Sequence, residues 1–255
     1  MRGLGTYTRT ELLSTLRDPS AMFFTVVMPL MMFAIFGVNS SFASETIKEG
    51  LNVSAVILVS MATYSAAAAG AAFAAQMAVE LSTGWGRQVA LSSGGMKTYL
   101  TAKLLSTLFL SMLPVAVLFT VGAATVSRMP SLQLWLTCAA LCYLAALPCA
   151  LFGILIGMVV PANSAAGIAA SAISLFAFLG NMFMPLGGKL LQFSQFTPLY
   201  GINRLVQWPL VGGTFASIDG LVTQGIGQQV ANLVAWILIF AGAALLALRL
   251  RGRKA

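Results

Sequence analysis

The sequence predicts an all-α integral membrane protein with six transmembrane helices. Of its 255 residues, 59% are hydrophobic and only 8% are charged, whereas a soluble domain carries about a quarter charged residues. Long apolar runs recur along the chain, and none of the six Asp and Glu residues lies inside one of them. Too few charges remain to cover a surface that faces water, so we expect the chain to fold in a lipid bilayer.

Six apolar runs are each long enough, or nearly so, for a helix across the hydrocarbon core, which takes about 20 residues. They cover residues 21–38, 53–79, 99–126, 132–160, 162–184 and 230–248. Asp18-Pro19 precedes the first run, and this pair suits the cap and the first turn of a helix. Pro114 and Pro148 predict kinks in the third and fourth helices.

The distribution of basic residues orients these helices. If both termini are cytoplasmic, ten Lys and Arg residues lie inside and four lie outside, and the positive-inside rule favours this arrangement. The inside set is Arg2, Arg9, Arg17, Arg87, Lys97, Lys103, Arg249, Arg251, Arg253 and Lys254, and the outside set is Lys48, Arg128, Lys189 and Arg204. The net charge of +8 therefore reflects membrane orientation, and we expect no nucleic-acid partner, because no basic cluster is interleaved with aromatic residues.

Two further segments are predicted to lie at the membrane surfaces. Residues 5–17 are expected to form an N-terminal interfacial helix with Leu12, Leu13 and Leu16 on one arc, and a disordered tail is the alternative. Residues 185–229 are apolar but broken by Pro and Gly, so they cannot form one span. We expect re-entrant outer helices here, between spans five and six, and a plain extracellular loop is the alternative.

The composition also excludes several kinds of chemistry. The chain has no His, which removes Ser-His and Cys-His catalysis and histidine metal sites. Cys138, Cys142 and Cys149 lie in one apolar run without further ligands, so we expect buried thiols and no metal site. Residues 94–98, GGMKT, depart from the phosphate-loop pattern. We therefore expect neither an enzyme nor a cofactor site in this chain, and without a carboxylate at membrane depth ion coupling is not favoured.

Mildly polar stripes follow one face of the second and fifth predicted helices. The first stripe contains Ser60, Thr63, Ala67, Gly70 and Ala74, and the second contains Asn163, Ser164, Gly167, Ser171, Ser174, Phe178 and Asn181. Close helix packing through small residues explains such stripes, and so does the wall of a substrate path or a dimer face. Because neither stripe is charged, an amphipathic substrate is favoured over a small, highly charged one.

Two patches of sequence resemble a known family. The first contains Glu80, Gly84-Trp85, Arg87, Leu91, Tyr99 and Lys103, and the second contains Phe193, Phe196, Thr197-Pro198 and Tyr200. With the six spans and the re-entrant segment, they make the whole chain similar to the membrane subunit (permease) of type-2 ATP-binding-cassette (ABC) exporters. The Gly-Trp pair is most similar to the drug and antibiotic branch. Where members often have Thr-Pro, this chain has Ser92-Ser93-Gly94-Gly95.

The resemblance implies a role for each patch. Residues 80–97 would be a cytoplasmic coupling segment that docks on a separate ATPase chain, with Leu91 as one of its family positions. Glu80 and Arg87 would pair with charges of the ATPase, Trp85 would fill a pocket, and Gly84 would allow close approach. The outer gate would consist of Phe193, Phe196, Pro198 and Tyr200.

The resemblance further implies a dimer with a second permease copy or a paralogue, and two ABC ATPase subunits that carry ATP and Mg. The complex would lie in a bacterial-type plasma membrane, with N and C termini cytoplasmic. It would export a drug, antibiotic, peptide or lipid-like substrate from the cytoplasm or the inner leaflet. A secondary carrier for a neutral solute, a membrane enzyme of lipid metabolism and a non-transporting scaffold or immunity protein are the alternatives.

Overall fold

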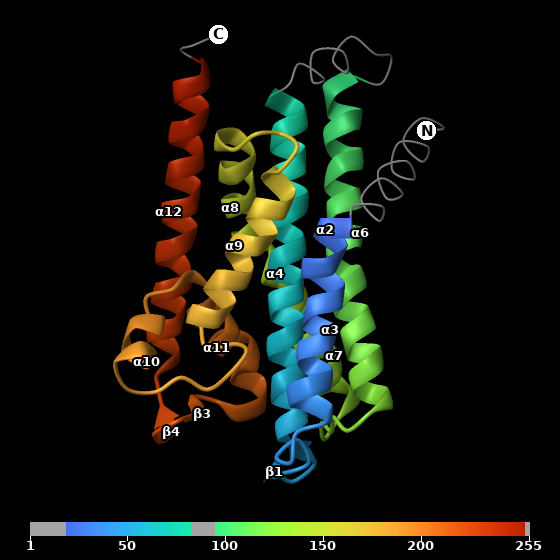
Figure 1. Cartoon of the computed structure of the whole chain (residues 1–255), viewed down its shortest axis with the longest axis vertical. Coiled ribbons are helices and arrows are strands. Elements are labelled where there is room, and N and C mark those ends of the chain that lie inside the picture. Colours follow the sequence, from blue (N-terminus) through green and yellow to red (C-terminus); the bar gives the residue numbers. More distant parts are fainter. Residues whose placement is uncertain (1–18, 83–94, 253–255) are drawn as a thin grey trace.

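The protein is mostly helical, and its long helices run side by side along the longest axis of the molecule (Figure 1). This computed structural model describes residues 19–82 and 95–252. The C-terminal ends of α4 and α12 and the N-terminal end of α6 lie at one end of the molecule, and the short β-hairpins of the described residues lie at the other (Figure 1). The interfacial helix predicted for residues 5–17 falls outside the described residues.

The helices follow the predicted apolar runs closely. The first run is a helical column made of α2 (Pro19–Met22), the π-helical η1 (Phe23–Val27), α3 (Met28–Met32) and the π-helical η2 (Phe33–Val38). The long helices are α4 (Val53–Ser82), α6 (Gly95–Ala124), α7 (Leu132–Leu144), α8 (Ala146–Val159), α9 (Ala165–Leu179) and α12 (Ile226–Gly252). Two shorter helices, α10 (Gly188–Ser194) and α11 (Pro198–Val211), separate α9 from α12.

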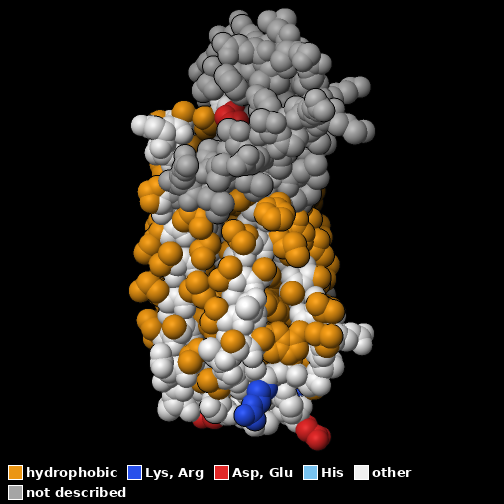
Figure 2. Space-filling model, turned by 90° about the vertical axis from the view of Figure 1, so that its right-hand side faces the viewer, with side chains coloured by type: hydrophobic (Ala, Val, Ile, Leu, Met, Phe, Trp, Pro, Cys, Tyr) orange, Lys and Arg blue, Asp and Glu red, His pale blue; other side chains and the backbone are white. Residues whose placement is uncertain are grey.

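Within residues 19–82 and 95–252, three stretches of helix are long and apolar enough to cross a membrane. They are Val53–Glu80, Leu132–Val159 and Ile226–Ala247. Shorter apolar helices cover Phe23–Val38, Phe109–Ala124 and Ala165–Leu179. On the face shown in Figure 2, apolar side chains cover the flank of the molecule, and the charged side chains lie toward its two ends. This distribution suits a protein whose flank contacts lipid.

Helix α4 forms the centre of the protein, because its small side chains let neighbouring helices approach closely. Its main partner is α8, and α6, α7, α9, α11 and the N-terminal column also contact it. An added Cβ on Gly70 would lie 2.5 Å from the carbonyl oxygen of Ala146 in α8. Gly153 and Gly157 of α8 face the backbone of α4 at Ala71 and Ala75 in the same way. The small residues of α4 are therefore used for packing within one chain.

The structure differs from the all-α prediction by two hairpins. The strands β1 (Thr46–Lys48) and β2 (Leu51–Asn52) pair antiparallel, and so do β3 (Thr214–Ser217) and β4 (Gly220–Thr223). Both are too short for the alternation of polar and apolar residues to reveal them. Near Pro148 the predicted helix is interrupted, since α7 ends at Leu144 and α8 begins at Ala146, whereas α6 continues without a break through Pro114.

Asn52 fastens the hairpin end of α4 to the chain after α6. Its Nδ2 donates to the carbonyl oxygen of Val126 at 2.8 Å, and its Oδ1 accepts from the backbone N–H of Arg128 at 2.9 Å. Because Asn52 is only 3% exposed, Asn52→Ala leaves buried groups unpaired, and we expect it to lower the free energy of unfolding by about 1–3 kcal/mol. Asn39→Ala, at an exposed position, should change it by no more than about 0.5 kcal/mol. Unfolding midpoints of the purified variants test this, and equal losses would contradict it.

Candidate functional site

The predicted coupling segment, residues 80–97, lies between α4 and α6. Its first three residues belong to the last turn of α4 and its last three to the first turn of α6, so both of its ends are helical. Glu80 is half-buried in α4. The other predicted contact residues, Gly84, Trp85, Arg87 and Leu91, fall outside the described residues.

The four residues of the predicted outer gate lie in two different environments. Phe193 and Phe196 are 56% and 76% exposed, and the carbonyl oxygen of Phe196 accepts from Nε1 of Trp236 at 2.9 Å. Pro198 and Tyr200 are buried at the start of α11. The structure therefore places an exposed aromatic pair on the surface and turns the other two residues toward the interior.

Tyr200 belongs to a small apolar cluster beneath the hairpin β3–β4. The cluster also contains Leu186, Leu191 and Phe215, and it is separate from the main core. The hydroxyl of Tyr200 donates to Oε1 of Gln224 at 2.8 Å, and its ring meets that of Phe215 edge-on at 6.3 Å. The hairpin thus packs on α11 through the contact between Phe215 of β3 and Tyr200 of α11.

Polar residues gather where α11 packs against α4 and the end of α9, and we call them the outer polar cluster, after the side of the membrane that the sequence predicts for Arg204. Its members are Ser60 of α4, Asn181 after α9, and Asn203, Arg204 and Gln207 of α11. Nη1 of Arg204 donates to Oε1 of Gln207 at 2.9 Å. Nε2 of Gln207 in turn donates to Oγ of Ser60 at 2.5 Å. Nη2 of Arg204 and Nδ2 of Asn203 both approach the carbonyl oxygen of Asn181 at 3.4 Å. The cluster therefore connects α4, the end of α9 and α11.

Asn181 was predicted on the polar stripe of a helix over 162–184, and this placement is wrong. Helix α9 ends at Leu179, because Asn181 adopts a left-handed conformation with φ 58°. The backbone N–H of Met182 then donates to the carbonyl oxygen of Ala177, as in a Schellman helix end, where Asn is accepted in place of Gly. The side chain of Asn181 caps the next turn, since Oδ1 accepts from the backbone N–H of Leu186 at 2.8 Å.

Arg204 is a buried cation. Its side chain is 8% exposed, and its guanidinium lies 3.8 Å from the ring centroid of Phe215 and 5.4 Å from that of Tyr200. Burial lowers the pKa of Arg204 to about 10, while the neighbouring Tyr200 opposes the shift, so the group stays charged at neutral pH. The positive-inside count assigns Arg204 to the outer side of the membrane, and it does not predict that the side chain is buried.

The residues of the two predicted stripes have distinct surroundings. Thr63 is fully buried, and its Oγ1 donates to the carbonyl oxygen of Val59 at 2.7 Å. Ser174 lies 2.7 Å from the hydroxyl of Tyr64. Ser171 and Phe178 of α9 face outward, and Phe178 is 43% exposed. Within one chain, the stripe on α4 is thus a packing surface, including Gly70, and only part of the stripe on α9 is open.

The three cysteines are buried with free thiols, as the sequence predicts. The thiol of Cys142 lies 3.5 Å from the carbonyl oxygen of Val59 and 3.5 Å from Oγ1 of Thr63. Cys142 of α7 therefore contacts α4, whereas Cys149 is buried in α8. Within residues 19–82 and 95–252, no three side chains of the metal-ligating types gather into one group.

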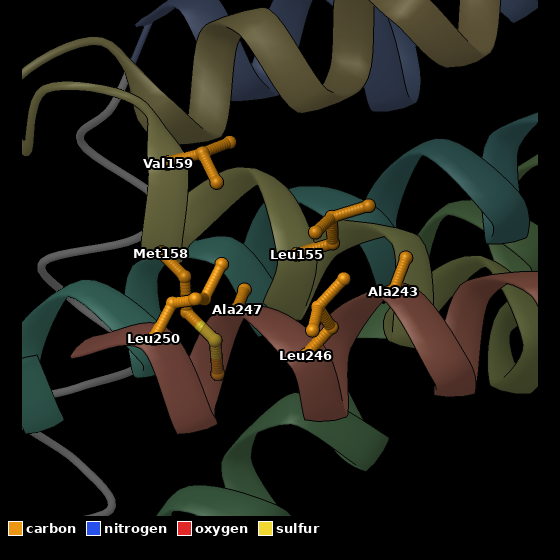
Figure 3. A pocket seen from close by; sticks show the side chains of 7 residues that line it. All are labelled: Leu155, Met158, Val159, Ala243, Leu246, Ala247 and Leu250. Atoms are coloured by element: carbon orange, nitrogen blue, oxygen red, sulfur yellow. The ribbon is translucent and has the colours of Figure 1, made fainter. Parts of the chain in front are cut away.

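A shallow apolar groove lies between α8 and α12, toward the C-terminal end of α12 (Figure 3). Its lining is formed by Leu155, Met158, Val159, Ala243, Leu246, Ala247 and Leu250. All seven side chains are apolar, so the groove offers no group that would orient a polar ligand.

Compared with known proteins, the chain matches no protein-family model, and no curated protein matches it significantly. The geometry above and the sequence are therefore the basis for assigning a function.

Proposed function

We propose that the chain is the membrane subunit of a type-2 ABC exporter, with six spans formed by the N-terminal column, α4, α6, α7–α8, α9 and α12. The observation that carries the proposal is the pattern from Glu80 to Lys103 between two long helices, with Trp85 as its anchor. The ends of α4 and α6 that flank this segment lie opposite the hairpins, at the same end as the C-terminus of α12 (Figure 1). This arrangement supports a cytoplasmic docking segment.

The helices α10 and α11 support the same assignment, because they interrupt the chain between α9 and α12 at the hairpin end. In the proposed protein they re-enter the membrane from its outer side. Two copies of the chain form the permease, and each contacts one ATPase subunit through residues 80–97. ATP and Mg bind to the ATPases, and closure of the ATPase pair moves the coupling segments. The spans then rearrange and release an amphipathic substrate outward near Phe193–Tyr200.

The test is co-purification of the chain with an ABC ATPase encoded by a neighbouring gene. We expect the wild-type pair to co-purify and to hydrolyse ATP in nanodiscs. Trp85→Ala should weaken the association and lower the coupled ATPase rate by about tenfold or more, since aromatic anchors dominate interfaces. Glu80→Ala should have a smaller effect, and Glu45→Ala, an exposed carboxylate at the hairpin end, should have none.

Three outcomes would redirect the assignment. Labelling of a cysteine introduced at position 85 from outside the cell would reverse the orientation and exclude docking. Transport by the purified chain alone under an ion gradient would favour a secondary carrier. Stable binding of another protein without ATP-dependent flux would favour a scaffold or immunity protein.

A further inference from the structure

The outer polar cluster holds a positive charge without a negative partner. In the described part of the chain, no carboxylate forms an ion pair with Arg204, and its electrostatic neighbour is the neutral phenol of Tyr200. Asp219, on the hairpin, instead accepts from the backbone N–H of Gly188 at 2.6 Å. Burying an unpaired cation costs several kcal/mol. Neutral acceptors and aromatic faces offset only part of that cost.

The same cluster contains hydrogen-bond donors for which the described residues provide no acceptor. Nε of Arg204 and Nδ2 of Asn181 are both buried and without an acceptor. Their side chains are 8% and 5% exposed, and they are adjacent, because Nη2 of Arg204 approaches the carbonyl oxygen of Asn181. A guanidinium edge with a free Nε–H, next to an amide N–H, matches the lone pairs of an oxyanion.

The site lies below the outer end of the helices and beneath the hairpin. Ser60 is seven residues into α4, which corresponds to about 10 Å of helix, and it joins the cluster through Gln207. Phe215 of the hairpin covers the guanidinium. The hairpin follows Gly212, which has φ 62°, and its apolar contacts belong to the small separate cluster of Leu186, Leu191 and Tyr200. Phe215 covers one face of the guanidinium, and the hairpin is held to the loop before α10 by Ser217, whose Oγ donates to the carbonyl oxygen of Leu186. A displacement of the hairpin would break that contact and expose this face, and it would leave the main core intact.

We propose that Arg204 and Asn181 form an oxyanion-binding site that takes one phosphate or carboxylate group from the outer side of the membrane. Asn203 and Gln207 position Arg204, and Phe215 closes the site. The oxyanion supplies a negative charge for Arg204 and acceptors for Nε of Arg204 and Nδ2 of Asn181, while Oδ1 of Asn203, a buried acceptor without a partner, is left to a protonated oxygen of the bound group. Binding of this group requires only the purified chain, so the proposal stands apart from the transport function. A phospholipid headgroup and free phosphate share this chemistry.

The experiment measures the unfolding midpoint of the purified chain in nanodiscs. One arm compares phosphatidylcholine alone with phosphatidylcholine that contains phosphatidylglycerol. The other arm adds inorganic phosphate to phosphatidylcholine nanodiscs and compares it with chloride at equal ionic strength. A ligand that binds only the folded state raises the midpoint in proportion to its occupancy. We expect a rise in at least one arm, and the arm that responds identifies the source of the oxyanion.

Three variants connect the rise to the site. Arg204→Met should fold, because it removes an unpaired buried charge, and it should lose the rise. Arg204→Lys keeps the charge but loses the planar edge, so it should need about tenfold more anion for the same rise, as expected for one lost charge-assisted hydrogen bond. Arg128→Met, at an exposed arginine of the same end, should respond like the wild type.

Either of two results would overturn the proposal. In one, the wild-type midpoint is unchanged in both arms. In the other, a variant of Arg204 keeps the full wild-type response, which would assign the stabilisation to surface charge. If Arg204→Met does not fold, the wild type and Arg204→Lys still decide between these outcomes.

Discussion

Gly153→Leu is expected to separate α8 from α4 and to cost about 3 kcal/mol or more of the free energy of unfolding. A Cβ at position 153 would collide with the backbone of Ala71, which cannot turn aside as a flexible side chain can. Since α4 and α8 form the most extensive helix contact of the fold, the collision affects the centre of the protein. The unfolding midpoint and the yield of monodisperse protein in nanodiscs measure the effect.

Gly242→Leu is the matched control. It makes the same chemical change in α12, at a glycine whose added Cβ would meet no atom within 4 Å. We expect the control to fold like the wild type. Since Leu has a higher helix propensity than Gly, equal losses in the two variants would mean that the added side chain is unfavourable at any position, and that the close approach of α4 and α8 does not cause the effect.

Tyr64→Ala is expected to lower the free energy of unfolding by about 3–5 kcal/mol, because it empties a fully buried position in α4. The ring of Tyr64 packs edge-on against Phe183 at 5.0 Å. Its hydroxyl lies 2.7 Å from Oγ of Ser174 and donates to Sδ of Met28 at 3.2 Å. The residue therefore connects the N-terminal column, α4 and α9.

Tyr64→Phe separates the two contributions of this residue. It keeps the ring and removes the hydroxyl, so we expect a loss of about 1 kcal/mol. Phe109→Ala, which removes a 61% exposed ring from α6, provides the control for loss of an aromatic side chain. Unfolding midpoints of the three variants give the order, and a Phe variant as unstable as the Ala variant would assign the effect to the hydrogen bonds.

The sequence predicts the helices well, because a long apolar run can be recognised from neighbouring residues alone, without knowledge of tertiary contacts. Pro148 marks the break between α7 and α8, and the Pro and Gly residues after position 184 predict the two short helices α10 and α11. The sequence does not reveal the end of α9. Asn181 ends this helix by adopting a left-handed backbone conformation, and an Asn can equally well continue a helix, so its presence alone predicts neither outcome.

Ser60 and Asn181 lie on the two predicted stripes, but the outer polar cluster as a whole could not be predicted, because its members come from segments far apart in the chain. Arg204 lies in a segment broken by prolines, where a charge is expected to face water. Phe215 covers its guanidinium, and its partner Gln207 reaches Ser60 of α4. The sequence around Arg204 gives no sign of either contact. The spacing of Asn203, Arg204 and Gln207 on one apolar helix was the available sign, since three polar residues within two turns rarely all face lipid.

Helix α4 is expected to move as one rigid rod. It is 30 residues long and contains no proline, and its glycine is packed against Ala146, so it has no hinge. Glu80 and Ser60 are separated by about 30 Å of this rod. A tilt of about 5° around one end moves the other end by about 2.6 Å, which is comparable to the length of a hydrogen bond. Such a tilt would lengthen the hydrogen bond between Ser60 and Gln207, and Gln207 is the acceptor for Arg204. A force on the Glu80 end of α4 would therefore change the hydrogen bonding of Arg204 through this one helix.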